Sequence, residues 1–122
     1  MVNIALLAAD ALATEDIAVE VIDPRTLEPF DAETIVTSVR KTNLVLVADA
    51  GTRKFGAGAE IAALIGDLAF DWLDAPIVRL GAADVPIPFS PALEAQVLPT
   101  VQSMTAAARA LVRRTAESVA RL

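Results

Sequence analysis

The feature that most restricts the fold is an unbroken apolar run, Leu44-Val45-Leu46-Val47, which contains no polar side chain. Successive side chains of a β-strand point to opposite faces of the sheet, so this run predicts a strand covered on both faces. A sheet covered on both faces needs a helical layer on each side. The run therefore indicates a three-layer α/β/α domain with a mainly parallel sheet.

Two other segments predict further strands. Residues 17–22 alternate in polarity and include β-branched residues. After Pro76, the short stretch Ile77-Val78-Arg79-Leu80 is a third predicted strand, which Gly81 ends. Segments with helical periodicity precede, separate and follow these strands. The predicted order of helix, strand, helix, strand, helix, strand and helix is typical of α/β domains with right-handed crossovers.

The helices are predicted from their ends and their apolar stripes. The first covers residues 4–13, and the second begins after Asp31, a predicted N-cap, with Glu33 in its first turn and Arg40-Lys41 in its last. Asn43 then turns the chain into the central strand. Residues 84–99, with four prolines, predict an irregular connection. The third helix has its stripe on Ile61, Leu64, Ile65, Leu68 and Trp72, and the C-terminal helix on Met104, Ala108, Leu111, Val112, Val119 and Leu122.

Composition excludes several classes of site. The 122 residues include no Cys and no His, which rules out disulfides, thiolate or imidazole metal sites and any nucleophile–histidine pair in this chain. A net charge of −6 makes nucleic acids and anionic membranes poor partners. No apolar run approaches the roughly 20 residues of a membrane span, and the N-terminus lacks the basic region of a signal peptide. We therefore expect a cytoplasmic protein.

The first candidate site is the loop Phe55-Gly56-Ala57-Gly58, which precedes the third helix. The free N–H groups at the start of a helix attract phosphate. A dinucleotide fingerprint would need glycine where Ile61 stands, and no Gly-Lys-Ser/Thr sequence completes a phosphate loop. Gly56 and Gly58 therefore form either an anion site or, more commonly, a turn that starts a helix.

Three carboxylates lie at or just after predicted strands, where α/β proteins gather functional groups: Asp23, Asp49 and Asp84. Aspartates at such positions also cap helices and turns, which is their commoner role. None of them stands beside a nucleophile. We therefore assign no catalytic, cofactor-binding or metal-binding residue.

A third candidate is Trp72, which has Asp71 and Asp74 close to it in the sequence. A tryptophan accompanied by acidic residues can anchor an interface with a basic partner. The alternative is that Trp72 only ends the apolar stripe of the third helix.

Several sequence phrases, taken in order, resemble a known family. They are Val19-Glu-Val-Ile-Asp-Pro-Arg-Thr-Leu-Glu-Pro-Phe-Asp31, Phe55-Gly-Ala-Gly-Ala-Glu-Ile-Ala-Ala63, Ala69-Phe-Asp-Trp-Leu-Asp-Ala-Pro76 and Asp84-Val-Pro-Ile-Pro-Phe-Ser-Pro-Ala-Leu-Glu94. Together they resemble the transketolase C-terminal-type domain in the β subunit of thiamine-diphosphate-dependent 2-oxo acid dehydrogenases, of the pyruvate, branched-chain and acetoin types. The resemblance extends to about Val112 and does not choose among these substrates.

The resemblance implies a supporting role rather than a catalytic one. In that family, thiamine diphosphate, Mg²⁺ and substrate bind in other domains, and the C-terminal domain serves subunit association and docking. The implied partners are the α subunit, the rest of the β subunit, a second β copy and the basic binding domain of the acyltransferase core, in a homo- or hetero-oligomer. The docking region includes Asp74. Two alternatives stay open: a free-standing α/β module that binds an anion at Gly56–Gly58, and an enzyme acting through Asp23 or Asp49.

The chain also departs from the family pattern. We assign residues 1–122 to one N-terminally truncated domain, with 113–122 as an extra helical tail. The family sheet has five strands, and the first two have no counterpart here; one of them would lie between segments 17–22 and 44–48. A gap there would leave two rows of backbone groups unpaired. We expect an upstream segment, another copy of the chain or direct pairing of the two strands to fill it.

Overall fold

A computed structural model describes residues 1–120 of the chain. Residues 121 and 122 lie outside the described part, as do the side chains at 118 and 119, so the predicted stripe positions Val119 and Leu122 are not assessed. The elements are α1 (Val2–Ala13), α2 (Ala32–Thr42), β1 (Leu46–Thr52), α3 (Ala57–Ala69), the 3₁₀ turn η1 (Phe70–Trp72), β2 (Val78–Ala82), α4 (Pro91–Val97) and α5 (Val101–Val119).

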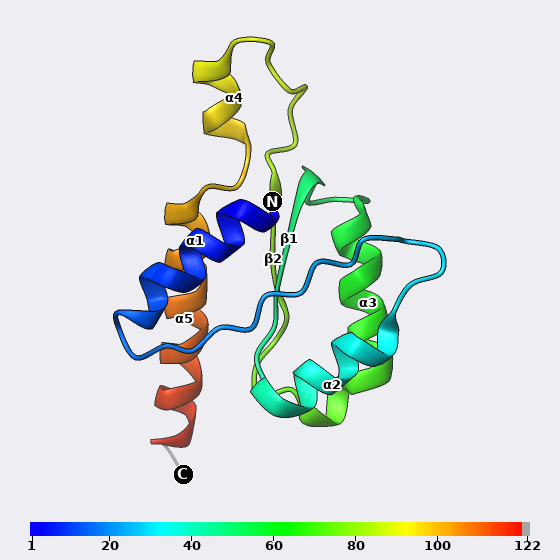
Figure 1. Ribbon diagram of the computed structural model, residues 1–122, viewed down its shortest axis with the longest axis vertical. Helices are drawn as coiled ribbons and strands as arrows, with labels where there is room; N and C mark the ends of the chain where they lie inside the picture. The colour runs from blue at the N-terminus through cyan, green and yellow to red at the C-terminus, as the bar shows by residue number, and fades with distance from the viewer. Residues whose placement is uncertain (121–122) are drawn as a thin grey trace.

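The elements form three layers around a small parallel sheet (Figure 1). β1 and β2 pair in parallel, with Leu46 opposite Val78 and Ala48 opposite Leu80. α2 packs with α3 on one face of the sheet and α1 packs with α5 on the other, and both α3 and α5 contact the two strands. The predicted α/β/α architecture with a parallel sheet is confirmed.

Each side of the sheet has its own buried apolar residues. Between the sheet and the α2–α3 layer, the core is formed by Ile35, Val39, Ile65 and Ala69. On the opposite side, α1 and α5 bury Leu12, Met104 and Leu111. Short aliphatic side chains in α1 and α3 permit this close packing of helices on strands.

The prediction for α2 is confirmed at both ends. The Asp31 side chain accepts a hydrogen bond of 3.0 Å from the Thr34 backbone N–H, and its bonds to Thr34 lower the pKa of this carboxyl. Asn43 closes the helix in the left-handed conformation, at φ 59°. These ends depend on residues within four positions of each other, so the sequence determines them locally.

Three strand predictions need correction. Residues 17–22 are extended but form no strand, because in the described part of the chain no backbone hydrogen bond joins them to a neighbour beyond the turn at Ile17. The central strand begins at Leu46 rather than Leu44. β2 runs through Gly81 to Ala82 rather than ending at Gly81. The absence of a side chain at Gly81 permits a close approach of β1, since a Cβ there would lie 2.9 Å from the Gly51 carbonyl oxygen, where the register between the strands shifts.

Two helical predictions also need correction. The proposed α3 stripe does not include Leu68, which is 48% exposed inside the helix while its neighbour Ala69 is buried. It does not reach Trp72, which is 36% exposed, because the α-helix ends at Ala69 and the 3₁₀ turn changes the periodicity. The connection at 84–99 contains the short helix α4. Pro91 is at the start of α4, where a missing N–H costs nothing and a fixed φ favours the helix.

Candidate association and docking surfaces

The glycine loop is built around Asp49, which ends the half-buried part of β1. Its carboxylate accepts hydrogen bonds from the backbone N–H of Gly51, at 3.0 Å, and of Gly58, at 3.2 Å. The second bond reaches the first turn of α3, where the helix dipole favours a negative charge. Asp49 therefore occupies the position at the start of α3 that an external anion would take.

Both glycines of the loop are explained by close packing. A Cβ at Gly56 would lie 2.3 Å from the Thr52 carbonyl oxygen, and one at Gly58 would lie 3.4 Å from side-chain atoms of Asp49 and Val47. These contacts hold the start of α3 against β1. An anion at Gly56 and Gly58 would have to displace the Asp49 carboxylate.

The other two strand-end carboxylates have partners of their own. Asp23 forms an ion pair with Arg25, and Asp84 with the Lys54 ammonium group at 2.6 Å. Within residues 1–120, no group of three Asp or Glu side chains is arranged to hold a metal ion.

Trp72 is held in place by the C-terminal end of α2. The Arg40 guanidinium carbon lies 4.2 Å from the centroid of the Trp72 ring, a cation–π contact. The Asn43 side-chain amide donates to the Trp72 carbonyl at 2.7 Å, and the Asp74 N–H donates to the Asn43 carbonyl at 3.0 Å. The backbone around Trp72 is therefore fixed, while the residue remains 36% exposed.

Asp71 and Asp74 are both exposed close to Trp72 in the chain, and the Phe70 side chain is 73% exposed. We call Phe70, Asp71, Trp72 and Asp74 the aromatic–acidic surface. It combines apolar area with two carboxylates, the composition that suits a basic partner. The structure thus places the three predicted docking residues on one short exposed segment.

A second surface was not identified from the sequence. Phe55 and Phe89 are almost fully exposed, at 99% and 104% of their reference areas. Phe55 is also in the left-handed conformation, at φ 58°, which is unfavourable for an aromatic residue. The Lys54–Asp84 ion pair joins the loop that carries Phe55 to the connection that carries Phe89. We call the exposed apolar side chains of these segments the carboxyl-end surface: Phe55, Val85, Ile87, Phe89 and Leu93.

This surface lies at the end of the domain toward which β1 points, and the connection with α4 projects from the same end (Figure 1). Apolar residues in a sequence normally indicate a buried core, so the exposure of the apolar residues of the carboxyl-end surface could not be inferred from the sequence. The accumulation of prolines at 86, 88 and 91 was the available signal, because it holds the chain outside the helical layers.

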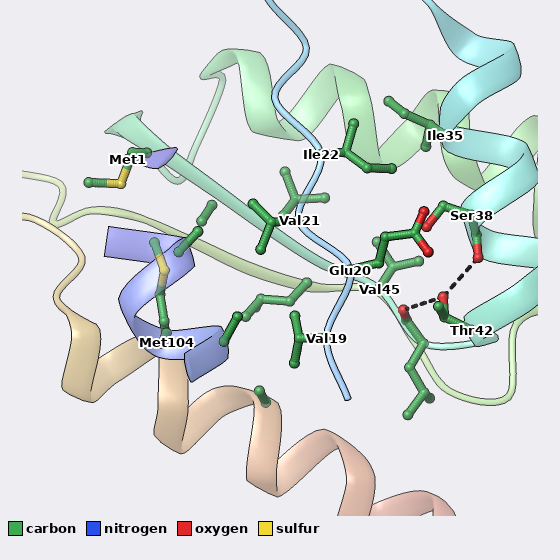
Figure 2. Close-up of a pocket in the computed structure, with 18 of the residues that line it drawn as sticks. Met1, Val19, Glu20, Val21, Ile22, Ile35, Ser38, Thr42, Val45 and Met104 are labelled. Atoms are coloured by element: carbon green, nitrogen blue, oxygen red, sulfur yellow. Dashed lines mark hydrogen bonds between the residues drawn. The ribbon is translucent and has the colours of Figure 1, made fainter. Parts of the chain in front are cut away.

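A third feature is a cavity of about 570 Å³ along the edge of β1 that faces away from β2. It lies between β1 and residues 17–24, and α1, α2 and α5 complete its walls. Figure 2 shows apolar side chains, among them Val21, Val45 and Met104, gathered around it. We call this cavity the edge groove.

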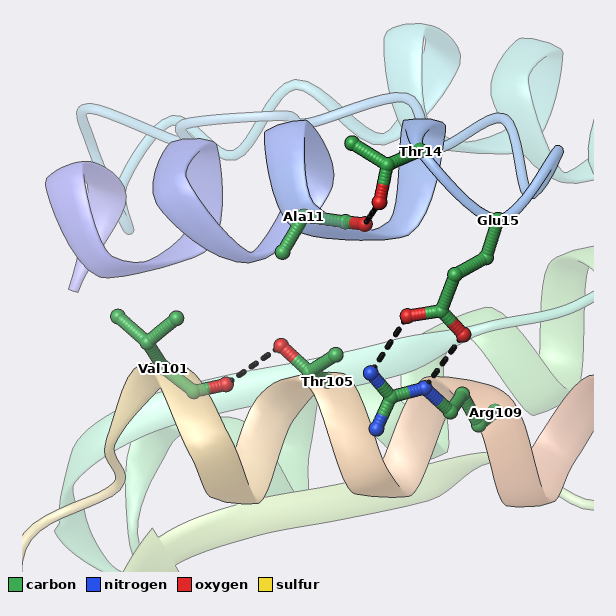
Figure 3. A network of polar contacts seen from close by, with 6 residues as sticks. All are labelled: Ala11, Thr14, Glu15, Val101, Thr105 and Arg109. Atoms are coloured by element: carbon green, nitrogen blue, oxygen red, sulfur yellow. Dashed lines mark hydrogen bonds and ion pairs between the residues drawn. The ribbon is translucent and has the colours of Figure 1, made fainter.

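An ion pair connects the two helices of the α1–α5 layer (Figure 3). The Arg109 guanidinium donates two hydrogen bonds to the Glu15 carboxylate, at 2.7 and 2.5 Å. The bonds to Arg109 lower the pKa of Glu15, and the same pairing raises the pKa of Arg109. This pair links the turn after α1 to the middle of α5.

Comparison with known proteins agrees with this architecture. The family described as "Transketolase, C-terminal domain" matches residues 1–104, most of the chain. The chain belongs to this family, as its sequence phrases predict.

Relatives of known name make the assignment more specific. The mitochondrial pyruvate dehydrogenase E1 component subunit beta of Dictyostelium discoideum is 47% identical over 107 residues, which are 88% of this chain and 30% of the relative. The acetoin:2,6-dichlorophenolindophenol oxidoreductase subunit beta of Bacillus subtilis is 48% identical over 99 residues, 81% of this chain and 29% of the relative. The chain thus spans less than a third of the length of these curated relatives.

The comparisons identify the family of the chain but do not single out one cellular location. Several relatives are mitochondrial by name, while others come from bacteria, so the cytoplasmic location stays a prediction. None of the helices within residues 1–120 has the length and apolarity needed to cross a membrane.

Proposed function

We propose that this chain supplies association and docking surfaces to the β subunit of a 2-oxo acid dehydrogenase. The other parts of the assembly then perform the oxidative decarboxylation and hold thiamine diphosphate and Mg²⁺. The proposed partners are the α subunit, the rest of the β subunit, a second β copy and the basic binding domain of the acyltransferase core. The names of the relatives support the assignment of this chain to a β subunit. The exposed surfaces of the chain support the association and docking role.

The exposure of the carboxyl-end surface is the observation that carries this proposal. Phe55 and Phe89 place whole aromatic side chains in water, and Ile87 is 54% exposed in the proline-rich connection that also carries Phe89. Monomeric proteins rarely expose large contiguous apolar patches, and such patches mark interaction sites. Burial of two phenylalanines against another subunit also offsets the unfavourable backbone conformation of Phe55.

The aromatic–acidic surface supports docking of a basic domain. Arg40 and Asn43 fix the Trp72 segment before a partner arrives, so little conformational freedom is lost on binding. The carboxylates of Asp71 and Asp74 would steer a basic partner, and the net charge of −6 adds to that attraction.

Subunit association is tested by replacing both aromatics in the complete E1 assembly. Phe55→Ser with Phe89→Ser should release the chain from the assembly, which native mass spectrometry reads directly. Leu7→Ser, at a site 57% exposed on α1, is the matched control and should leave assembly intact. Normal assembly of the double variant would refute the association role of this surface.

Docking is tested by titrating the basic binding domain of the acyltransferase into the assembled E1. Asp71→Asn with Asp74→Asn should weaken binding and flatten its salt dependence, because two steering charges are lost. Asp10→Asn with Glu117→Gln changes the net charge by the same amount at exposed sites elsewhere and should bind as the parent does. Equal weakening by both pairs would show a general charge effect and remove the docking role.

A further inference from the structure

A smaller groove lies against the first two turns of α3. It has a volume of about 290 Å³ and separates the start of α3 from the loop that precedes α2. Leu27, in that loop, is 61% exposed. The apolar residues that line the groove are Leu27, Phe30, Ala57, Ile61 and Leu64, and the charged ones are Glu28 and Glu60. We call it the α3 groove. It presents apolar walls to solvent with carboxylates beside them.

The exposed side of α3 continues from this groove along the helix. Leu68 follows Leu64 by four residues, which places both on one side of α3, one turn apart. Leu68 is 48% exposed, and Glu60 and Asp67 are exposed on the same side. We call Glu60, Leu64, Asp67 and Leu68 the α3 face. Its spacing is that of one face of an amphipathic helix, so its apolar residues could be covered by a second helix laid alongside.

The carboxylates of this surface have no ionic partner in the described part of the chain. Within residues 1–120, the ion pairs use the carboxylates of Glu15, Glu20, Asp23 and Asp84, none of which is on α3. α3 contains Glu60 and Asp67 and no Lys or Arg. Glu28 adds a third negative charge at the groove. The surface is therefore negative along its length and attracts a positively charged partner.

This charge selects among the possible occupants. Nucleic acids and anionic membranes are repelled by it. A second copy that paired α3 with α3 would bring like charges together. Arg113 and Arg114 are exposed on α5, but α5 belongs to the opposite helical layer (Figure 1). Contact between α5 of one copy and α3 of another is thus head-to-tail and forms no closed dimer. A basic segment of a different protein is the occupant that fits.

The spacing of the charges favours a helical segment. Glu60 and Asp67 are seven residues apart, a separation of about 10.5 Å along α3 at 1.5 Å per residue. Two basic residues at positions i and i+7 of a helix laid along α3 have the same separation. Apolar residues at i+3 and i+4 of that helix then lie between the two charges, opposite Leu64 and the groove.

We propose that the α3 groove and the α3 face bind a basic amphipathic helix of a partner protein. The helix lies along α3, with its apolar side chains against Leu27, Leu64 and Leu68. Its Lys or Arg side chains lie opposite Glu60 and Asp67. This contact uses no residue of the aromatic–acidic surface, so it goes beyond the docking role proposed above and does not depend on it.

The test measures binding of a designed helix to the 122-residue chain. The probe is the fluorescein-labelled peptide acetyl-Lys-Leu-Lys-Lys-Leu-Leu-Lys-Lys-Leu-Leu-Lys-amide, followed by fluorescence anisotropy at low ionic strength. Glu60→Gln with Asp67→Asn should raise the Kd about threefold to tenfold, because two exposed ion pairs are lost. Asp10→Asn with Glu117→Gln makes the same change in net charge at exposed sites away from α3 and should bind as the parent does.

The apolar part of the contact is tested separately. Leu27→Ser, at the wall of the groove, and Leu68→Ser, on the α3 face, should each raise the Kd about threefold or more, because apolar area is no longer covered on binding. Leu7→Ser, at a site 57% exposed on α1, is the matched control and should bind as the parent does. All three leucines are exposed, so circular dichroism should show that the variants remain folded.

A second peptide distinguishes a helical contact from general attraction between opposite charges. Acetyl-Leu-Lys-Lys-Leu-Lys-Leu-Lys-Lys-Leu-Lys-Leu-amide has the same composition, but its leucines are spread around the helix, and it should bind about tenfold more weakly. Equal affinity of the two peptides would overturn the proposal. So would equal weakening by the Asp10 and Glu117 pair, or binding that none of the α3 and Leu27 variants weakens, since the peptide would then occupy another surface. The docking titration uses Asp71 and Asp74 variants and a different partner, so the two failures are distinguishable.

Discussion

The Asp49 carboxylate accepts a hydrogen bond of 3.2 Å from the Gly58 N–H, joining β1 to the first turn of α3. The same carboxylate accepts from Gly51 at 3.0 Å, so one side chain orders the whole glycine loop. The glycines permit this arrangement, because a Cβ at Gly58 would meet the Cβ of Asp49 at 3.4 Å. A loop that resembles an anion site in sequence thus contains its own anion.

Replacing Asp49 should lower stability. Asp49→Ala leaves the Gly58 N–H at the start of α3 without its acceptor, a loss of about 1–2 kcal/mol in the free energy of unfolding. Urea unfolding measures it, with Asp10→Ala at an exposed position of α1 as the control. An Asp49→Ala midpoint equal to that of the parent would contradict the capping role.

The same variant discriminates between docking domain and anion-binding module. Millimolar phosphate should leave the Tm of the parent chain unchanged, because Asp49 fills the position, and should raise the Tm of Asp49→Ala if the vacated site binds anions. A rise of several degrees in the parent chain would instead support the anion-binding module.

Two glycines of the α3 region should respond in opposite directions to alanine. Gly56→Ala places a Cβ 2.3 Å from the Thr52 carbonyl oxygen, and the backbone must shift to relieve it, at a cost of about 1–3 kcal/mol. A Cβ at Gly66 meets nothing within 4 Å, so Gly66→Ala should stabilise the helix by about 0.5–1 kcal/mol. Thermal melts of the two variants compare the same chemical change at the N-cap and in the interior of α3. If both variants lower the Tm, the contact with the Thr52 carbonyl oxygen does not explain the loss, and added volume along α3 does.

Local features of the fold could be predicted from the sequence. The ends of α2 follow from Asp31 and Asn43, because a cap and a left-handed turn each need only a few neighbouring residues. The covered strand followed from an apolar run whose side chains on both faces had to be buried. The family phrases then extended these local signals to the whole domain.

Features that depend on a distant partner could not be predicted. Residues 17–22 have the alternation of a strand, but a strand exists only where a neighbour accepts its hydrogen bonds, and the edge groove separates this segment from β1. The exposure of Phe55 and Phe89 was missed for the opposite reason, since apolar residues predict burial without saying in which molecule. Both failures fall where the proposed role requires a partner.

Truncation of Leu12 tests whether α1 belongs to the cooperative unit. Leu12 is 2% exposed between α1 and α5, so Leu12→Ala should cost about 2–5 kcal/mol in the free energy of unfolding. Leu7→Ala, at 57% exposure on the same helix, is the matched control and should change it by about 0.5 kcal/mol at most. Chemical denaturation monitored by Trp72 fluorescence would measure both. A small loss for Leu12→Ala would mean that α1 unfolds separately from the sheet.

The ion pair between Glu15 and Arg109 should make stability depend on acid pH. The hydrogen bonds from Arg109 lower the pKa of Glu15 in the folded chain below its ordinary value of 4.5, while Arg109 stays charged throughout. The contribution of the pair is therefore fully present above pH 4.5 and is lost as the pH falls through the lowered pKa. Thermal melts should show a higher Tm for the parent than for Glu15→Gln at neutral pH, with the difference disappearing in acid. In an Arg109→Gln background, the pH-dependent effect of Glu15→Gln should be much smaller, because only the weaker attraction of Arg113 still lowers the pKa of Glu15. An undiminished effect would assign the pKa shift to a group other than Arg109.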